Sequence, residues 1–132
     1  LDQPATIQGT SGALRSRLEQ LGVWDKATEG CDYVLHVASP IPPFVPKNED
    51  DIIIPAVTGT KFVTEAAIRN KVKRLVFTSS CLTLFFGNEE KLLTEDDWAD
   101  PSKCSHYPKS KILAERALWE LYNKQDLKGQ HT

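Results

Sequence analysis

Two short apolar runs restrict the fold of this chain more than any other feature. They cover residues 33–38 and 75–80, and each ends in small or hydroxyl-bearing residues. Near-continuous apolar runs of this length are typical of parallel strands that are buried on both faces. A helical pattern fills residues 52–70 between them. The sequence therefore predicts an α/β fold whose strands are joined by right-handed crossovers.

Two long helices are expected, over residues 52–70 and 107–123. Residues 48–51 supply N-cap candidates and negative charge for the first, and Pro55 is tolerated in its first turn. Gly59 is expected to let this helix lie close to a strand. The residues expected to be buried are Ile53, Val57, Phe62, Ala66 and Ala67 in the first helix, and Ile112, Leu113, Leu118, Trp119 and Tyr122 in the second. Residues 89–103 are polar and are expected to form a surface excursion.

The N-terminal stretch has the pattern of a strand, a glycine turn and a helix. Residues 5–8 form the expected strand, Gly9 and Gly12 the turn, and residues 13–21 the helix, with Gly22 as its C-cap. Such a turn can present backbone N–H groups to a pyrophosphate. Arg15 stands where a third glycine would allow close packing, so an ordinary turn is the alternative.

A tyrosine and a lysine, Tyr107 and Lys111, lie four positions apart in the last expected helix, so they point the same way. An ammonium beside a phenol lowers the phenol pKa toward a useful range for proton donation. A chance surface pair is the alternative. Ala38 and Ser39 end the first apolar run, at the edge where parallel sheets bind ligands. We expect His36 to be a core imidazole and not a catalyst.

Composition fits one soluble domain with a sizeable core, since 40% of the 132 residues are apolar and 26% are charged. A net charge of -2 with scattered basic residues argues against nucleic-acid or membrane binding. Cys31, Cys81 and Cys104 show no metal spacing and are expected to be reduced thiols in a cytoplasmic protein. The sequence contains no methionine, which indicates a processed chain or part of a longer product.

Five blocks of the sequence resemble the extended short-chain dehydrogenase/reductase family, the NAD-dependent epimerase/dehydratase type. The chain is most similar to the dihydroflavonol reductase and cinnamoyl-CoA reductase group. The blocks occur in the family's order and span nearly the whole chain, at residues 7–14, 31–40, 55–60, 76–80 and 107–117. The resemblance implies a Rossmann-like parallel sheet with flanking helices.

The resemblance also implies a reaction and a set of site residues. In it, Ser80 hydrogen-bonds a substrate carbonyl, Tyr107 donates a proton, and Lys111 stabilises the phenolate and holds the nicotinamide ribose. Ser79 and Thr83 are the alternatives to Ser80. The cofactor is NAD or NADP, with NADP slightly favoured. The implied cofactor-binding residues are Gly9, Ser11, Gly12, Leu14, Ala38, Ser39, Tyr107 and Lys111. No metal is implied.

The same resemblance indicates that parts of the family's domain are missing. Two strands normally follow the first glycine-turn helix, and residues 21–32 have no room for them. A partial domain is expected, in which residues 1–22 hold the glycine turn and first helix and residues 23–132 hold the later strands and the catalytic helix. About three adjacent strands would remain. Their open edges predict a partner chain or a homo-oligomer.

Two hypotheses stay open at the level of the sequence. The first is an NAD(P)-dependent reductase or dehydrogenase of a small carbonyl compound, with part of its chain absent from this sequence. The second is a catalytically inactive, shortened relative that serves as a binding or scaffold subunit. The missing methionine favours the first hypothesis. Arg15 and the abrupt join near Gly22 favour the second.

Overall fold

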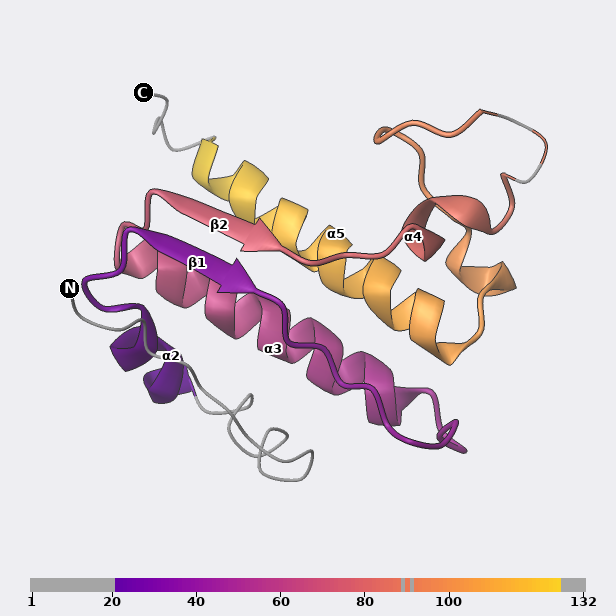
Figure 1. Cartoon of the computed structure of the whole chain (residues 1–132), viewed down its shortest axis with the longest axis horizontal. Helices are drawn as coiled ribbons and strands as arrows, with labels where there is room; N and C mark the ends of the chain where they lie inside the picture. Colours follow the sequence, from indigo (N-terminus) through magenta and orange to yellow (C-terminus); the bar gives the residue numbers. More distant parts are fainter. Residues whose placement is uncertain (1–20, 89, 91, 127–132) are drawn as a thin grey trace.

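A parallel pair of strands in front of two long helices forms the centre of the molecule (Figure 1). The computed structural model describes residues 21–88, 90 and 92–126. The helices are α2 (Leu21–Thr28), α3 (Asp50–Arg69), α4 (Leu82–Phe85) and α5 (His106–Asp126), with a short 3₁₀ helix at Pro101–Lys103. The strands are β1 (Tyr33–His36) and β2 (Arg74–Phe77).

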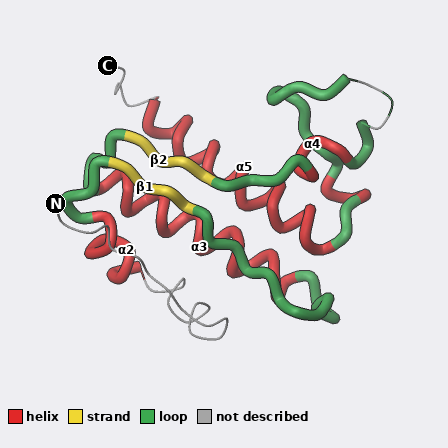
Figure 2. The backbone as a smooth tube through the Cα atoms, viewed as in Figure 1, coloured by secondary structure: helices red, strands yellow, loops and turns green. Residues whose placement is uncertain are grey.

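The strand–helix–strand unit expected from the apolar runs is confirmed. β1 and β2 pair in parallel, with Tyr33 opposite Arg74 and His36 opposite Phe77. α3 carries the chain back between them, antiparallel to both strands, and α5 lies beside α3 (Figure 2). The described residues contain these two strands, and the strand expected at residues 5–8 lies outside them.

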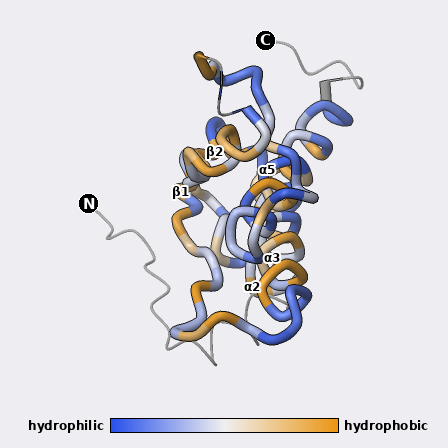
Figure 3. The backbone as a smooth tube through the Cα atoms, turned by 90° about the vertical axis from the view of Figure 1, so that its right-hand side faces the viewer, coloured by the Kyte–Doolittle hydropathy of each residue, from blue (hydrophilic) through white to orange (hydrophobic). Residues whose placement is uncertain are grey.

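One expectation about the strands is wrong, because they are not buried on both faces. The helices α3 and α5 lie on one side of the sheet, as the side view of the tube shows (Figure 3). On the strands, the side chains of Tyr33, Leu35 and Val76 are 64%, 70% and 48% exposed. A continuous apolar run is typical of a parallel strand that is covered by helices on both faces. In the described part of the chain, helices cover only one face of the two strands.

The two long helices pack mainly against each other. Their buried apolar residues are Ile52, Ala56, Val63, Ala66 and Ala67 in α3, and Ile112, Ala114 and Ala117 in α5. Ala66, Ala67 and Ile112 were expected in this core. Small alanines at the contact allow the helix axes to approach closely.

Several residues expected in the core are less buried than predicted. Ile53, Val57 and Phe62 are half-buried, because the buried arc of α3 is centred on Ile52 and Ala56. Three consecutive isoleucines at residues 52–54 fit more than one helical phase, so periodicity alone does not select the buried arc.

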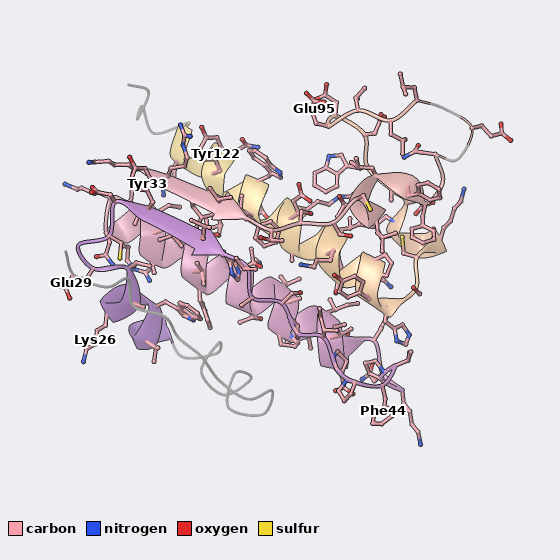
Figure 4. All side chains as sticks on the ribbon, viewed as in Figure 1. Lys26, Glu29, Tyr33, Phe44, Glu95 and Tyr122 are labelled. Carbon is pink, nitrogen blue, oxygen red and sulfur yellow. The ribbon has the colours of Figure 1, made fainter. Side chains whose placement is uncertain are left out.

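The aromatic end of α5 also differs from the prediction. Leu113 and Leu118 are half-buried, while Trp119 and Tyr122 are 46% and 50% exposed. The two aromatic rings pack edge to face, with centroids 5.8 Å apart. Tyr122 lies near the C-terminal end of α5 (Figure 4). The buried residues of α5 are Ile112 and the small Ala114 and Ala117, whereas the two larger rings stay partly exposed.

The sequence predicted Gly22 as a helix C-cap, but this prediction is wrong, because Gly22 lies inside α2. The residue that follows α2 with a left-handed conformation is Gly30, whose φ is +68°. The next amide, of Cys31, donates to the Thr28 carbonyl at 3.1 Å and closes the helix end. Gly30 therefore performs the C-cap role, because glycine adopts a positive φ without a Cβ clash.

Candidate active site

The ends of β1 and β2 lie side by side, because the strands are parallel and in register. The Thr78 amide donates to the His36 carbonyl at 3.0 Å, so the hydrogen bonding between the strands continues one residue past the end of β2. The segments that follow, residues 37–39 and 78–80, thus leave the sheet at the same edge. Ligands of open parallel sheets gather at this edge.

A small cavity lies at this edge, between the sheet and the two long helices. It brings together three of the residues that the sequence predicted for the site, Ala38, Ser39 and Lys111. His36, Thr60 and Phe77 are among its other lining residues. Sequence reasoning did not select Thr60 as a site residue, although it ends the family-like block at residues 55–60.

Lys111 is buried, with 4% of its surface exposed. Its Nζ donates to the Thr78 carbonyl at 3.1 Å and lies 5.8 Å from the centroid of the Phe77 ring. Burial lowers the pKa of the Lys111 ammonium, and the Glu115 carboxylate opposes that shift. Burying a charged lysine is energetically unfavourable, and folding alone does not require it. A buried lysine in a cavity is therefore a candidate functional group.

Tyr107 lies in the first turn of α5, one turn before Lys111, and is half-buried. Its carbonyl accepts a hydrogen bond of 2.7 Å from the Ser110 hydroxyl, and Ser110 is fully buried. Residues four apart on a helix share a face, so the phenol and the ammonium project from the same side of α5. Tyr107 and Ser80 are not among the residues that line the small cavity.

The three candidate hydroxyls after β2 have different partners. Ser79 Oγ donates to the Glu115 carboxylate, and Thr83 Oγ1 donates to the Ser80 carbonyl at 2.7 Å. Ser80 Oγ instead accepts the Leu82 amide at 3.2 Å, at the start of α4. Since a hydroxyl has one hydrogen to donate, these bonds occupy the hydrogens of Ser79 and Thr83, while the bond at Ser80 does not use its own.

His36 is a core imidazole, as expected, with 5% of its surface exposed. Its Nε2 lies 3.5 Å from Thr60 Oγ1, and its ring packs edge to face on Phe77 at 5.4 Å. Burial, with a smaller contribution from the Lys111 charge, lowers the pKa of His36 to about 4. At neutral pH, the His36 imidazole that lines the cavity is therefore uncharged.

Because the buried His36 imidazole has a lowered pKa, the free energy of unfolding is expected to decrease as the pH is lowered. The native pKa of His36 is about 4 and the unfolded value is 6.5, so the unfolded chain binds more protons between these values. The stabilisation is complete above the unfolded pKa and is lost as pH falls toward the native one. Between neutral pH and about pH 5, we expect the free energy of unfolding to drop by about 2 kcal/mol through this residue.

Urea unfolding of the chain and of a His36→Gln variant over this pH range measures the effect. The difference in free energy of unfolding between the two proteins should shrink as pH falls. A constant difference would show that His36 does not titrate in this way.

The remaining predicted cofactor residues, Gly9, Ser11, Gly12 and Leu14, lie outside the described residues. Glu115 is a residue of the site region that sequence reasoning did not select. Its signal was its position, one helical turn after Lys111 in the same block. None of Cys31, Cys81 and Cys104 forms a disulfide bond.

The model of the 3-beta hydroxysteroid dehydrogenase/isomerase family matches residues 10–131. This chain belongs to that family. The resemblance to reductases of the epimerase/dehydratase type is thereby confirmed. Cinnamoyl-CoA reductase 2 of Arabidopsis thaliana is 37% identical over an alignment of 99 residues, which covers 70% of this chain and 29% of the relative. Dihydroflavonol 4-reductase of the same plant is 34% identical over an alignment of 122 residues, which covers 86% of this chain and 32% of the relative.

Solved structures of reductases share the fold. Yeast methylglyoxal/isovaleraldehyde reductase Gre2, crystallised with NADPH, superposes with a TM-score of 0.69 at 28% identity, over 85% of this chain and 38% of that one. The α/β, Rossmann-like fold predicted from the sequence is thus confirmed. The chain spans less than two fifths of the length of these relatives. None of the helices in the described ranges has the length and apolar character needed to cross a membrane.

Proposed function

We propose that this chain carries the carbonyl-reducing site of an NADPH-dependent oxidoreductase that acts on small molecules. The observation that carries the proposal is Lys111, a buried ammonium at the carboxyl ends of β1 and β2, in one cavity with Ala38 and Ser39. Tyr107 precedes it by one turn. Relatives of the family are reductases by name, and the yeast reductase binds NADPH.

The residues at the sheet edge fit a nicotinamide cofactor. A buried lysine and two small residues at the ends of parallel strands offer a cation and close backbone approach to a ribose. The glycine turn predicted from the sequence, with Gly9, Ser11, Gly12 and Leu14, is proposed to hold the pyrophosphate. When bound, the cofactor supplies a hydride to the substrate carbonyl carbon.

Each residue of the site has a separate task in this proposal. Ser80 donates its hydroxyl hydrogen to the carbonyl oxygen, since its bond to the Leu82 amide leaves that hydrogen unused. Tyr107 gives its phenolic proton to the same oxygen as negative charge develops there. The Lys111 ammonium stabilises the resulting phenolate and holds the ribose hydroxyls.

The alternative is an inactive, shortened relative that binds a partner chain. The exposed apolar face of the sheet, with Tyr33 and Leu35 at 64% and 70% exposure, favours this second function. Cofactor binding separates the two functions, because a scaffold has no need of a working nicotinamide site.

Titration of the full chain with NADPH, followed by nucleotide fluorescence, tests the proposal. We expect saturable binding that weakens by about ten- to a hundredfold in Lys111→Met, since a hydrogen bond from a charged donor contributes about 1.5–3 kcal/mol. Lys124→Met is the control, because Lys124 pairs with Glu120 on the exposed side of α5. Absence of saturable binding to the parent chain would contradict the reductase and favour the scaffold.

A further inference from the structure

Glu115 links the segment after β2, which carries Ser79 and Ser80, to the helix α5, which carries Tyr107 and Lys111. It lies in α5, one turn after Lys111, and is half-buried. Its Oε2 accepts the hydrogen bond from Ser79 Oγ, and its Oε1 accepts one from the Trp119 indole at 3.4 Å. The carboxylate therefore joins the segment after β2 to the helix that carries Tyr107 and Lys111.

The segment after β2 is held by α5 at two consecutive residues. Lys111 Nζ holds the Thr78 carbonyl at 3.1 Å, and Glu115 holds the Ser79 hydroxyl. Ser80 is the next residue along the chain. Two adjacent attachments to neighbouring turns of one helix fix both the distance and the direction of the backbone that leads to Ser80.

Glu115 also lies four residues after Lys111 in α5, on the same helix face. The groups around the ammonium are the His36 imidazole from β1, the Phe77 ring and the Thr78 carbonyl at the end of β2, and Glu115 from α5 itself. α3 contributes the Thr60 hydroxyl to the same cavity. His36 is neutral near pH 7 and adds no charge to this group, whereas the Glu115 carboxylate raises the pKa of Lys111 and so opposes the effect of burial.

We propose that Glu115 is a positioning residue of this site, which holds the Ser79–Ser80 backbone against α5 and places a negative charge one helical turn from Lys111. The inference rests on the proposed function for the roles of Ser80 and Lys111. Glu115 touches neither substrate nor cofactor in this assignment. It acts through the serine segment on one side and through the lysine on the other.

Two variants of the full chain separate the two roles. Glu115→Gln keeps an acceptor oxygen for Ser79 and removes the charge, whereas Ser79→Ala keeps the charge and removes the hydrogen bond. Glu120→Gln is the matched control, because Glu120 lies in the same helix and pairs with exposed Lys124. Circular dichroism of each variant checks that α5 is intact.

The lysine role is measured by NMR titration of chain labelled with ¹³C-lysine, with the Lys111 signal assigned from the Lys111→Met spectrum. We expect Glu115→Gln to lower the pKa of Lys111 further, because burial is then unopposed, while Ser79→Ala and Glu120→Gln leave it at the parent value. An unchanged Lys111 titration in Glu115→Gln would overturn this role.

The backbone role is measured by hydrogen exchange of the Leu82 amide, which donates to Ser80 Oγ. We expect about tenfold faster exchange in Ser79→Ala, the effect of losing one hydrogen bond, and parent-like exchange in Glu120→Gln. Equal exchange in the parent and Ser79→Ala would overturn it. Neither readout needs cofactor, so absent NADPH binding contradicts the proposed function without deciding the contacts of Glu115.

Discussion

Replacing Tyr107 with phenylalanine is expected to lower kcat/KM for carbonyl reduction by about 10²–10⁴-fold, the contribution of a positioned general acid. The substitution removes one oxygen and keeps the half-buried ring at the start of α5. The measurement is NADPH consumption by the full chain with a small aldehyde or ketone. Binding of NADPH should stay within about twofold of the parent, because Lys111 remains in place.

Tyr122→Phe is the matched control for this prediction, since the same atom is removed from the same helix. Tyr122 is 50% exposed at the far end of α5 from Tyr107. Its loss should leave kcat/KM unchanged. Undiminished turnover by Tyr107→Phe would remove Tyr107 from the proposed mechanism, and an equal loss in both variants would point to damage of the helix.

Replacing Ile112 with alanine is expected to lower the free energy of unfolding by about 2–5 kcal/mol, the range for a large buried aliphatic side chain. Ile112 has no exposed surface and lies on α5, whose main partner is α3. Small domains are stable by only about 5–15 kcal/mol, so the variant would lose a large share of its stability. Urea unfolding followed by circular dichroism measures the change.

Leu92→Ala provides the comparison, because Leu92 is 92% exposed and its truncation opens no cavity. It should alter the free energy of unfolding by about 0.5 kcal/mol or less. If Ile112→Ala and Leu92→Ala unfold at the same urea concentration, the contact between α3 and α5 is not the stabilising core described above.

The positions of the two strands and the pair on the last helix could be predicted because they depend on local sequence. The apolar runs 33–38 and 75–80 contain most of β1 and β2, although the strands themselves stop at His36 and Phe77. A four-residue spacing places Tyr107 and Lys111 on one helix face. The predicted helix 107–123 corresponds to α5, His106–Asp126, and the strand pair is parallel as expected. Periods of two and 3.6 residues are properties of the backbone and need no partner.

The helix phases and the helix end after α2 could not be predicted in the same way. Ile52 and Ile53 are chemically alike, and only the contact between α3 and α5 makes the first of them the buried one. Gly22 was the cap expected from the sequence, whereas the turn into β1 places the positive φ at Gly30. A glycine in the sequence indicates that a positive φ is possible there, but the surrounding structure decides which glycine adopts it.

By itself, the sequence determined the family, the α/β class and the candidate residues Ser80, Tyr107 and Lys111. The tertiary structure decided that Lys111 is buried beside His36 and Thr60, and that Glu115 receives the Ser79 hydroxyl from 36 residues earlier in the chain. It also showed that one face of the strands is uncovered. Spacing along a chain fixes which side chains share a helix face, whereas burial and charge pairing arise only when distant segments pack together.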